Sequence, residues 1–210
     1  FLLIFINLIF KHLENYSNNS DTNIKFIEKN VLYNFYNNLD YLKKMKSVNK
    51  KARNLEHKNL VHFYSENIHN FNKKQIYLLK TLTTIINKHI DNQKIKNDWN
   101  YVLFKNIENN YPHTHKKFIF LPLQFINSIN SNMSILDNKY VINTLIHEKI
   151  HVLQRLYTKK FEQLYKLWHL KQVNNIKNID KLNNLVRDNP DGQSKNWVFE
   201  YNNKIIWFNC

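Results

Sequence analysis

The feature that most constrains the fold of this chain is an apolar repeat of helical spacing between Tyr140 and Tyr157. Apolar side chains recur every three or four residues and cover one broad face. A face of this kind predicts an amphipathic helix that is buried on one side. The apolar positions are Val141, Ile142, Leu145, Ile146, Ile150, Leu153 and Leu156.

An HExxH pentapeptide, from His147 to His151, lies inside this predicted helix. Residues four apart on a helix share one face, so the two imidazoles can chelate a single metal ion. Glu148 is rotated about 100° from His147, which places its carboxylate beside the position of a metal-bound water. We therefore predict a Zn²⁺ site with His147 and His151 as ligands and Glu148 as the general base of hydrolysis.

The composition fits one domain of 210 residues, with a formal net charge of +15. Such a charge can indicate binding to nucleic acid or to an anionic membrane. The lysines are spread along the chain, however, and only the segment Lys43–Arg53 is densely basic. No nucleic-acid-binding motif accompanies it, so we expect a solvated lysine-rich surface. The single cysteine, Cys210, excludes an intramolecular disulfide and supports neither a Cys-ligated zinc nor a cysteine nucleophile.

The apolar segment Phe1–Phe10 is too short to span a bilayer. It is compatible with the tail of a signal or membrane segment, and equally with a buried helix or strand. Membrane anchoring through this segment therefore stays open, and the localisation is not predicted.

Helical periodicity dominates the first part of the chain, which we predict as a helical N-terminal region, residues 1–95. Residues 96–210 form the predicted metal-binding region, unless the two regions are one continuous domain. In it, Lys117–Leu123 predicts a strand, and Pro122 places that strand at a sheet edge. Further helices are expected at Ile24–Met45, Leu55–Ile68, Lys73–His89 and Lys160–Val173, and a C-terminal hairpin at Trp197–Phe208.

A catalytic zinc usually takes a third protein ligand. The metzincin extension is excluded, because Gln154 and Tyr157 stand where it requires glycine and histidine. The downstream glutamate of thermolysin-like gluzincins is also missing, since Leu170 and Lys171 lie at that distance. Four third-ligand candidates remain, namely Glu162, His169, Asp191 and Glu200.

The developing oxyanion needs a second electrophile besides the metal. His113 and His115 are two residues apart and would point the same way from an extended chain, so both could face the metal cleft. Arg187 and Tyr201 are chemically able to serve as well.

The segment Leu145–Tyr157, followed by Arg187–Gly192 and a Trp-containing strand, resembles zincin-type HExxH metallopeptidases. It is similar in particular to a loosely characterised set of HExxH...NPDG proteins from algae, protists and large DNA viruses. The resemblance covers roughly Pro112 to Phe208. It implies an α+β, predominantly helical, zincin-like fold with an active-site helix, an upstream edge strand and a C-terminal hairpin. It also implies Asp191 as the third zinc ligand, with Glu200 next.

The expected function is therefore that of a zinc metallopeptidase acting on a peptide or protein substrate. A catalytically silent binding protein that keeps the zincin scaffold is the main alternative. A basic, helical nucleic-acid-binding protein centred on Lys43–Arg53 is a weaker one.

Overall fold

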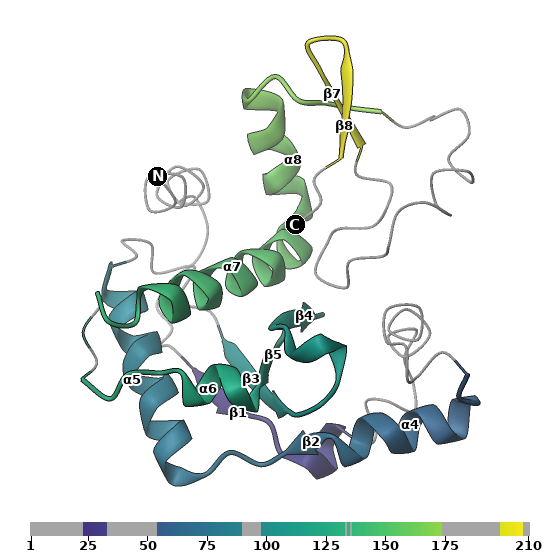
Figure 1. Cartoon of the computed structure of the whole chain (residues 1–210). Coiled ribbons are helices and arrows are strands. Elements are labelled where there is room, and N and C mark those ends of the chain that lie inside the picture. The colour runs from purple at the N-terminus through teal and green to yellow at the C-terminus, as the bar shows by residue number, and fades with distance from the viewer. Residues whose placement is uncertain are drawn as a thin grey trace.

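The structure is a computed structural model that describes residues 23–32, 54–89, 98–132, 134, 136–173 and 198–207. These residues form a mixed α/β fold with a five-stranded sheet and a separate three-stranded sheet (Figure 1). The expected mixture of helices and strands is confirmed. The segments Phe1–Phe10 and Lys43–Arg53 lie outside the described residues. Within the described part of the chain, no helix has both the length and the apolar character needed to cross a membrane.

The five-stranded sheet is built around β3 (Trp99–Phe104). β1 (Ile24–Phe26) and β5 (Phe118–Pro122) pair with β3 in parallel, and β2 (Ile68–His69) pairs with it in antiparallel fashion. β4 (His113–His115) pairs antiparallel with β5. Strands from both sides of residue 95 therefore belong to one sheet.

The edge strand next to the helix that carries HExxH is β4, and the prediction that Lys117–Leu123 forms the edge was wrong. β5 lies between β3 and β4. Pro122 is tolerated there because it is the last residue of β5, where the missing N–H can remove only a terminal ladder bond. β4 is only three residues long, so the sequence around it shows no strand pattern and predicts a turn.

The long helices match the sequence periodicity well. α5 (Lys73–His89) has the predicted bounds, while α4 (His57–Glu66) and α7 (Lys139–Leu156) differ from prediction by a few residues at most. The predicted helix Ile24–Met45 instead begins with β1. The shorter helices are α6 (Leu123–Asn127), α8 (Thr158–Leu167) and the 3₁₀ turn η1 (Glu108–Asn110).

The two faces of the five-stranded sheet carry separate apolar clusters. Successive strand side chains point to opposite faces, so Tyr101 and Ile119 join the cluster that contains α5 and α7. Phe104 and Phe120 join the other cluster, which contains residues of α4. This alternation decides which side chains of β4 can face the metal helix.

The second sheet has the order β6 (Lys171–Gln172), β7 (Val198–Tyr201) and β8 (Lys204–Trp207). The expected C-terminal hairpin is confirmed as β7 and β8. Asn202 and Asn203 form its turn with φ of 48° and 61°. Two successive left-handed residues are typical of a type I′ turn, which asparagine tolerates well.

Candidate metal centre

The position of α7 is fixed at its C-terminal end by Arg155. The Arg155 guanidinium donates through Nη2 to Oγ1 of Thr114 in β4. It also donates through Nε to the carbonyl of Lys116, 3.1 Å away, in the turn between β4 and β5. Figure 1 shows α7 above β4 and β5, with α5 crossing near its beginning. The HExxH helix therefore lies beside the edge strand.

His147 and His151 bring their Nε2 atoms to within 3.0 Å of each other on α7. The ring centroids are 4.6 Å apart and the ring planes are nearly perpendicular, at 86°. A tetrahedral zinc with bonds of about 2.05 Å holds two nitrogens about 3.3 Å apart, so chelation requires only a small adjustment. His147 is exposed, whereas His151 is only 2% exposed. The two nitrogens can therefore bind one metal ion, with His147 on the side that faces solvent.

The second ring nitrogen of His151 is engaged by Gln154. Nδ1 of His151 lies 2.9 Å from Oε1 of Gln154, and Nε2 of Gln154 donates to the hydroxyl of Tyr165 at 2.8 Å. An amide oxygen can only accept, so Nδ1 of His151 carries the proton. The lone pair of His151 is therefore on Nε2, which is the nitrogen that faces His147. This is the tautomer that binds a metal through Nε2.

The surroundings of both imidazoles lower their pKa and so favour the neutral form. Burial, with a smaller contribution from the charges of His147 and Arg155, lowers the pKa of His151 to about 4, and the hydrogen bond to Gln154 opposes this shift. Burial also lowers the pKa of His147. A metal binds only the neutral form of an imidazole, so these environments favour coordination over protonation.

Glu148 is only 3% exposed, although it is an acid on the helix that carries the histidines. Arg155 follows Glu148 by seven residues, and this spacing places the two side chains on the same flank of α7. Because Arg155 contacts β4, the Glu148 flank faces the edge strand. Glu148 therefore lies on the buried flank of α7 that also carries the contact between Arg155 and β4.

Lys149 is also buried, with 2% exposure, and sequence reasoning assigned it no role. Its Nζ donates to the carbonyl of Asp98 at 3.0 Å and lies 5.0 Å from the ring centroid of Trp99. Burial lowers its pKa to about 7. The spacing from Leu145 and Val152 would have placed Lys149 on the buried face, because these residues are four before and three after it. Lys149 thus ties α7 to the start of β3.

No third ligand joins the two histidines among the residues that the structure describes, where no group of three His, Cys, Asp or Glu side chains could hold a metal. Glu162 is half-buried in α8, and Glu200 is half-buried in β7 opposite Lys171. Asp191 and Arg187 lie outside the described residues. Their proposed roles therefore remain predictions.

His169 lies at the C-terminal end of α8 in a turn that explains its position. Its φ of 59° is left-handed, its N–H donates to the carbonyl of Lys166 at 3.0 Å, and the N–H of Leu170 donates to the carbonyl of Tyr165 at 2.9 Å. These two bonds define a Schellman motif, in which the left-handed residue ends the helix. This turn ends α8 at Leu167, so the predicted helix Lys160–Val173 was too long.

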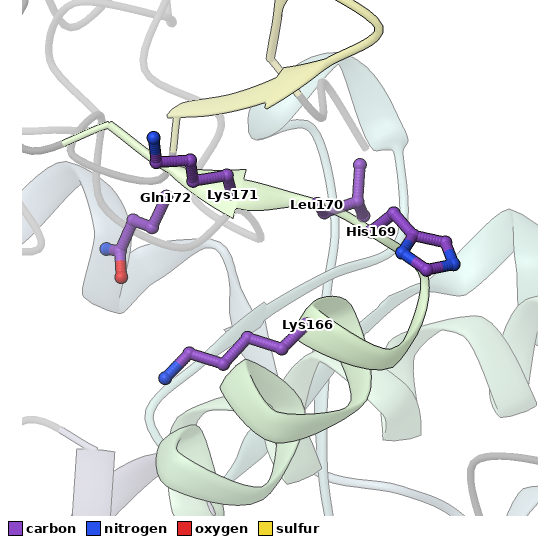
Figure 2. Close-up of a pocket in the computed structure, with 5 residues that line it drawn as sticks. All are labelled: Lys166, His169, Leu170, Lys171 and Gln172. Carbon is purple, nitrogen blue, oxygen red and sulfur yellow. The ribbon is translucent and has the colours of Figure 1, made fainter.

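Beside this turn is a hollow of about 460 Å³ (Figure 2). The polar side chains that line it are all exposed, and those of Lys166 and His169 point in opposite directions. The lining contains no acid, and neither metal-helix histidine contributes to it. It is lined by Lys166, His169, Leu170, Lys171 and Gln172. The hollow is a feature of the helix end and not of the candidate metal centre.

The possibility that His113 and His115 face the metal cleft does not match their position in β4. His113 stacks on Phe120 with centroids 4.9 Å apart, and lies 5.2 Å from Phe104, so it faces the α4 side of the sheet. His115 shares this face because it is two residues further along β4. The register that pairs His113 with Phe120 leaves Thr114 as the residue that faces α7.

His113 is held in a single protonation state by its surroundings. Its Nδ1 donates to the carbonyl of Tyr111 at 3.1 Å, and burial lowers its pKa to about 4. Tyr201, the other described oxyanion candidate, is exposed at the last position of β7.

Sequence reasoning missed four side chains that shape the centre. Gln154 and Tyr165 hold His151, while Arg155 and Thr114 join α7 to β4. The spacing of three residues between His151 and Gln154 signals a contact on one helix face. The partners Tyr165 and Thr114 lie on other elements, and no local pattern indicates them.

Comparison with known proteins found no match to any family model, to any curated protein or to any solved structure. The chemistry of α7 and of the residues around it is therefore what indicates a function for this protein.

Proposed function

We propose that this protein is a zinc-dependent metallopeptidase with a zincin-like fold. The observation that carries the proposal is the separation of 3.0 Å between the Nε2 atoms of His147 and His151, on a helix whose Glu148 is buried beside them. Two facing nitrogens, with a carboxylate on the adjacent flank, fit the needs of a hydrolytic zinc site.

Each residue of the motif has a separate role in this proposal. His147 and His151 hold the metal, which when bound lowers the pKa of water to about 7 and polarises a scissile carbonyl. Glu148 accepts the proton of the attacking water and passes it to the leaving amine. Its burial supports this role, since the carboxylate is held next to the two histidines and away from bulk water.

The third ligand is expected from the part of the chain that follows α8. The resemblance to HExxH...NPDG proteins favours Asp191, which lies outside the described residues. Glu200 is the next choice, ahead of His169 and Glu162, because His169 already ends a helix and is exposed.

The substrate class is proposed from the edge strand. β4 is the last strand in the order of the described five-stranded sheet, and a sheet edge is where an extended peptide would add as a further strand. An extended peptide can bind there through backbone hydrogen bonds. The Glu148 flank of α7 faces the same strand, which brings the general base toward the backbone of such a peptide.

The test compares cleavage of a peptide library by the wild-type chain with cleavage by Glu148→Gln. The variant should retain the metal and lose at least about 100-fold in rate, because general-base catalysis contributes that much or more. Glu66→Gln is the matched control, since Glu66 is an exposed acid of α4 that pairs with Lys29 at the surface. Equal loss of activity in both variants would contradict the assignment of Glu148.

A catalytically silent binding protein with the same scaffold is the second candidate. Such a protein would bind zinc and cleave no peptide, and Glu148→Gln would leave its partner binding unchanged. No described residue favours the nucleic-acid-binding alternative, which depends on Lys43–Arg53.

A further inference from the structure

Three side chains form a hydrogen-bonded network behind the proposed ligand pair. It runs from Nδ1 of His151 to Oε1 of Gln154 over 2.9 Å, and from Nε2 of Gln154 to the Tyr165 hydroxyl over 2.8 Å. His151 and Gln154 belong to α7, whereas Tyr165 belongs to α8. This network therefore connects the imidazole of His151 on α7 to α8, the next helix.

The orientation of the Gln154 amide decides which nitrogen of His151 carries the proton. With Oε1 toward the ring, as in the structure, the proton is on Nδ1 and the lone pair is on Nε2. With the amide reversed, its NH₂ group would donate to Nδ1. The proton would then be on Nε2 of His151, where it would block coordination. Only the first arrangement allows His151 to bind a metal through the nitrogen that faces His147.

Tyr165 is placed to hold the amide in the first orientation. The tyrosine is 7% exposed, and its ring packs against Phe199 of β7 at 5.2 Å and against Trp168 at 5.9 Å between centroids. These ring contacts fix the position of the hydroxyl. That hydroxyl accepts from the NH₂ end of the amide and so turns the oxygen of Gln154 toward His151.

We infer that Gln154 is a positioning residue that sets the tautomer and orientation of His151, and that Tyr165 holds the Gln154 amide. The effect on metal affinity rests on the proposed zinc site. The tautomer of His151 does not, since it is a property of the metal-free chain. Outer partners of this kind typically change metal affinity 10- to 100-fold when they are removed.

The first experiment measures the His151 tautomer by ¹⁵N NMR of the metal-free full chain at neutral pH, with the resonances assigned by comparison with His151→Gln. The wild-type ring should carry its proton on Nδ1. Gln154→Glu should preserve this state, because a carboxylate also accepts from Nδ1. Gln154→Leu removes the acceptor and should shift the population toward the proton on Nε2. A wild-type proton on Nε2, or no change in Gln154→Leu, would overturn the inference.

The second experiment titrates Zn²⁺ into the metal-free full chain in competition with a chelator. Gln154→Leu should weaken binding about 10- to 100-fold, and Gln154→Glu should stay close to the wild type. Tyr165→Phe should lose less than Gln154→Leu, because the acceptor of Nδ1 remains. The control is Gln163→Leu, since Gln163 is an exposed glutamine of α8.

The two readouts separate the inference from the proposed function. Equal zinc affinity in Gln154→Leu and Gln163→Leu would overturn the role of Gln154 in metal binding. If the wild-type chain binds no zinc, the proposed function fails, and the tautomer measurement still decides whether Gln154 positions His151. Thermal unfolding of each variant identifies a loss of the fold, and the near-isosteric Gln154→Glu keeps the test valid if Gln154→Leu is unstable.

Discussion

Arg155 of α7 donates a hydrogen bond to Oγ1 of Thr114 in β4, and this bond sets the flank of the metal helix that faces the edge strand. The same guanidinium donates to the carbonyl of Lys116 at 3.1 Å. Helix and strand are thereby held in one relative position. That position places the buried Glu148 on the flank of α7 facing the strand proposed to bind the substrate.

Arg155 and Thr114 should be energetically coupled in a double-mutant cycle. Arg155→Leu should lower the free energy of unfolding by about 1.5–3 kcal/mol, the usual contribution of a hydrogen bond to a charged group. In a Thr114→Val background the same substitution should lower the free energy of unfolding by less, since the hydroxyl that Arg155 contacts is already absent. Chemical denaturation of the four proteins measures the coupling. Strictly additive losses, or an equal loss in Lys159→Leu on the exposed side of α8, would show that the bond contributes nothing specific.

His113 should make the stability depend on pH between about 6.5 and 4. Above this window the imidazole is neutral in both states. Within it, the unfolded chain takes up a proton that the folded chain refuses, because burial lowers the pKa of His113 to about 4. Stability therefore falls as the pH falls, by up to about 3 kcal/mol.

The pH dependence of His113 can be isolated by substitution. His113→Phe should remove this part of the dependence, since a phenyl ring can take the stacked place against Phe120. His62→Phe changes an exposed histidine of α4 and serves as the control. Unfolding measured across the pH range should give a flatter curve for the first variant only. Parallel curves for both variants and the wild type would contradict the buried, neutral state of His113.

Lys149 should have a structural role and take no part in metal binding or catalysis. Lys149→Met replaces the buried ammonium with an apolar chain of similar length, and should leave the stability at pH 7 unchanged or raise it. Lys149→Ala should lower it by about 2–4 kcal/mol, because it leaves a cavity against Trp99. Zinc binding should be the same in Lys149→Met and in the wild type. A loss of zinc in that variant, with the fold intact, would give Lys149 a role in the metal site.

Long periodic segments were predictable from the sequence. The bounds of α5 and the extent of α7 follow from apolar spacing over many residues, and the hairpin at Asn202-Asn203 follows from its turn chemistry. β1, β2 and β4 have only two or three residues each, so they show no measurable alternation. The edge was assigned to the wrong strand because proline at the end of a strand is compatible with an interior position.

The candidate site was predictable only as far as it is local to one helix. The pairing of His147 with His151 and the place of Glu148 follow from helical geometry alone. The direction of His113 depends on strand register, and a shift of one residue would have turned it toward α7. The partner of Gln154 depends on how α8 packs against α7, which no local pattern encodes.

The central claim is tested most directly by the zinc content of the purified full chain, determined by elemental analysis after dialysis. The wild-type protein should retain one Zn²⁺ per chain, and His147→Ala should retain none while unfolding at a temperature similar to that of the metal-free wild type, because His147 is exposed. Glu148→Gln should retain the metal. A wild-type chain that holds no stoichiometric zinc would contradict the assignment of His147 and His151 as metal ligands.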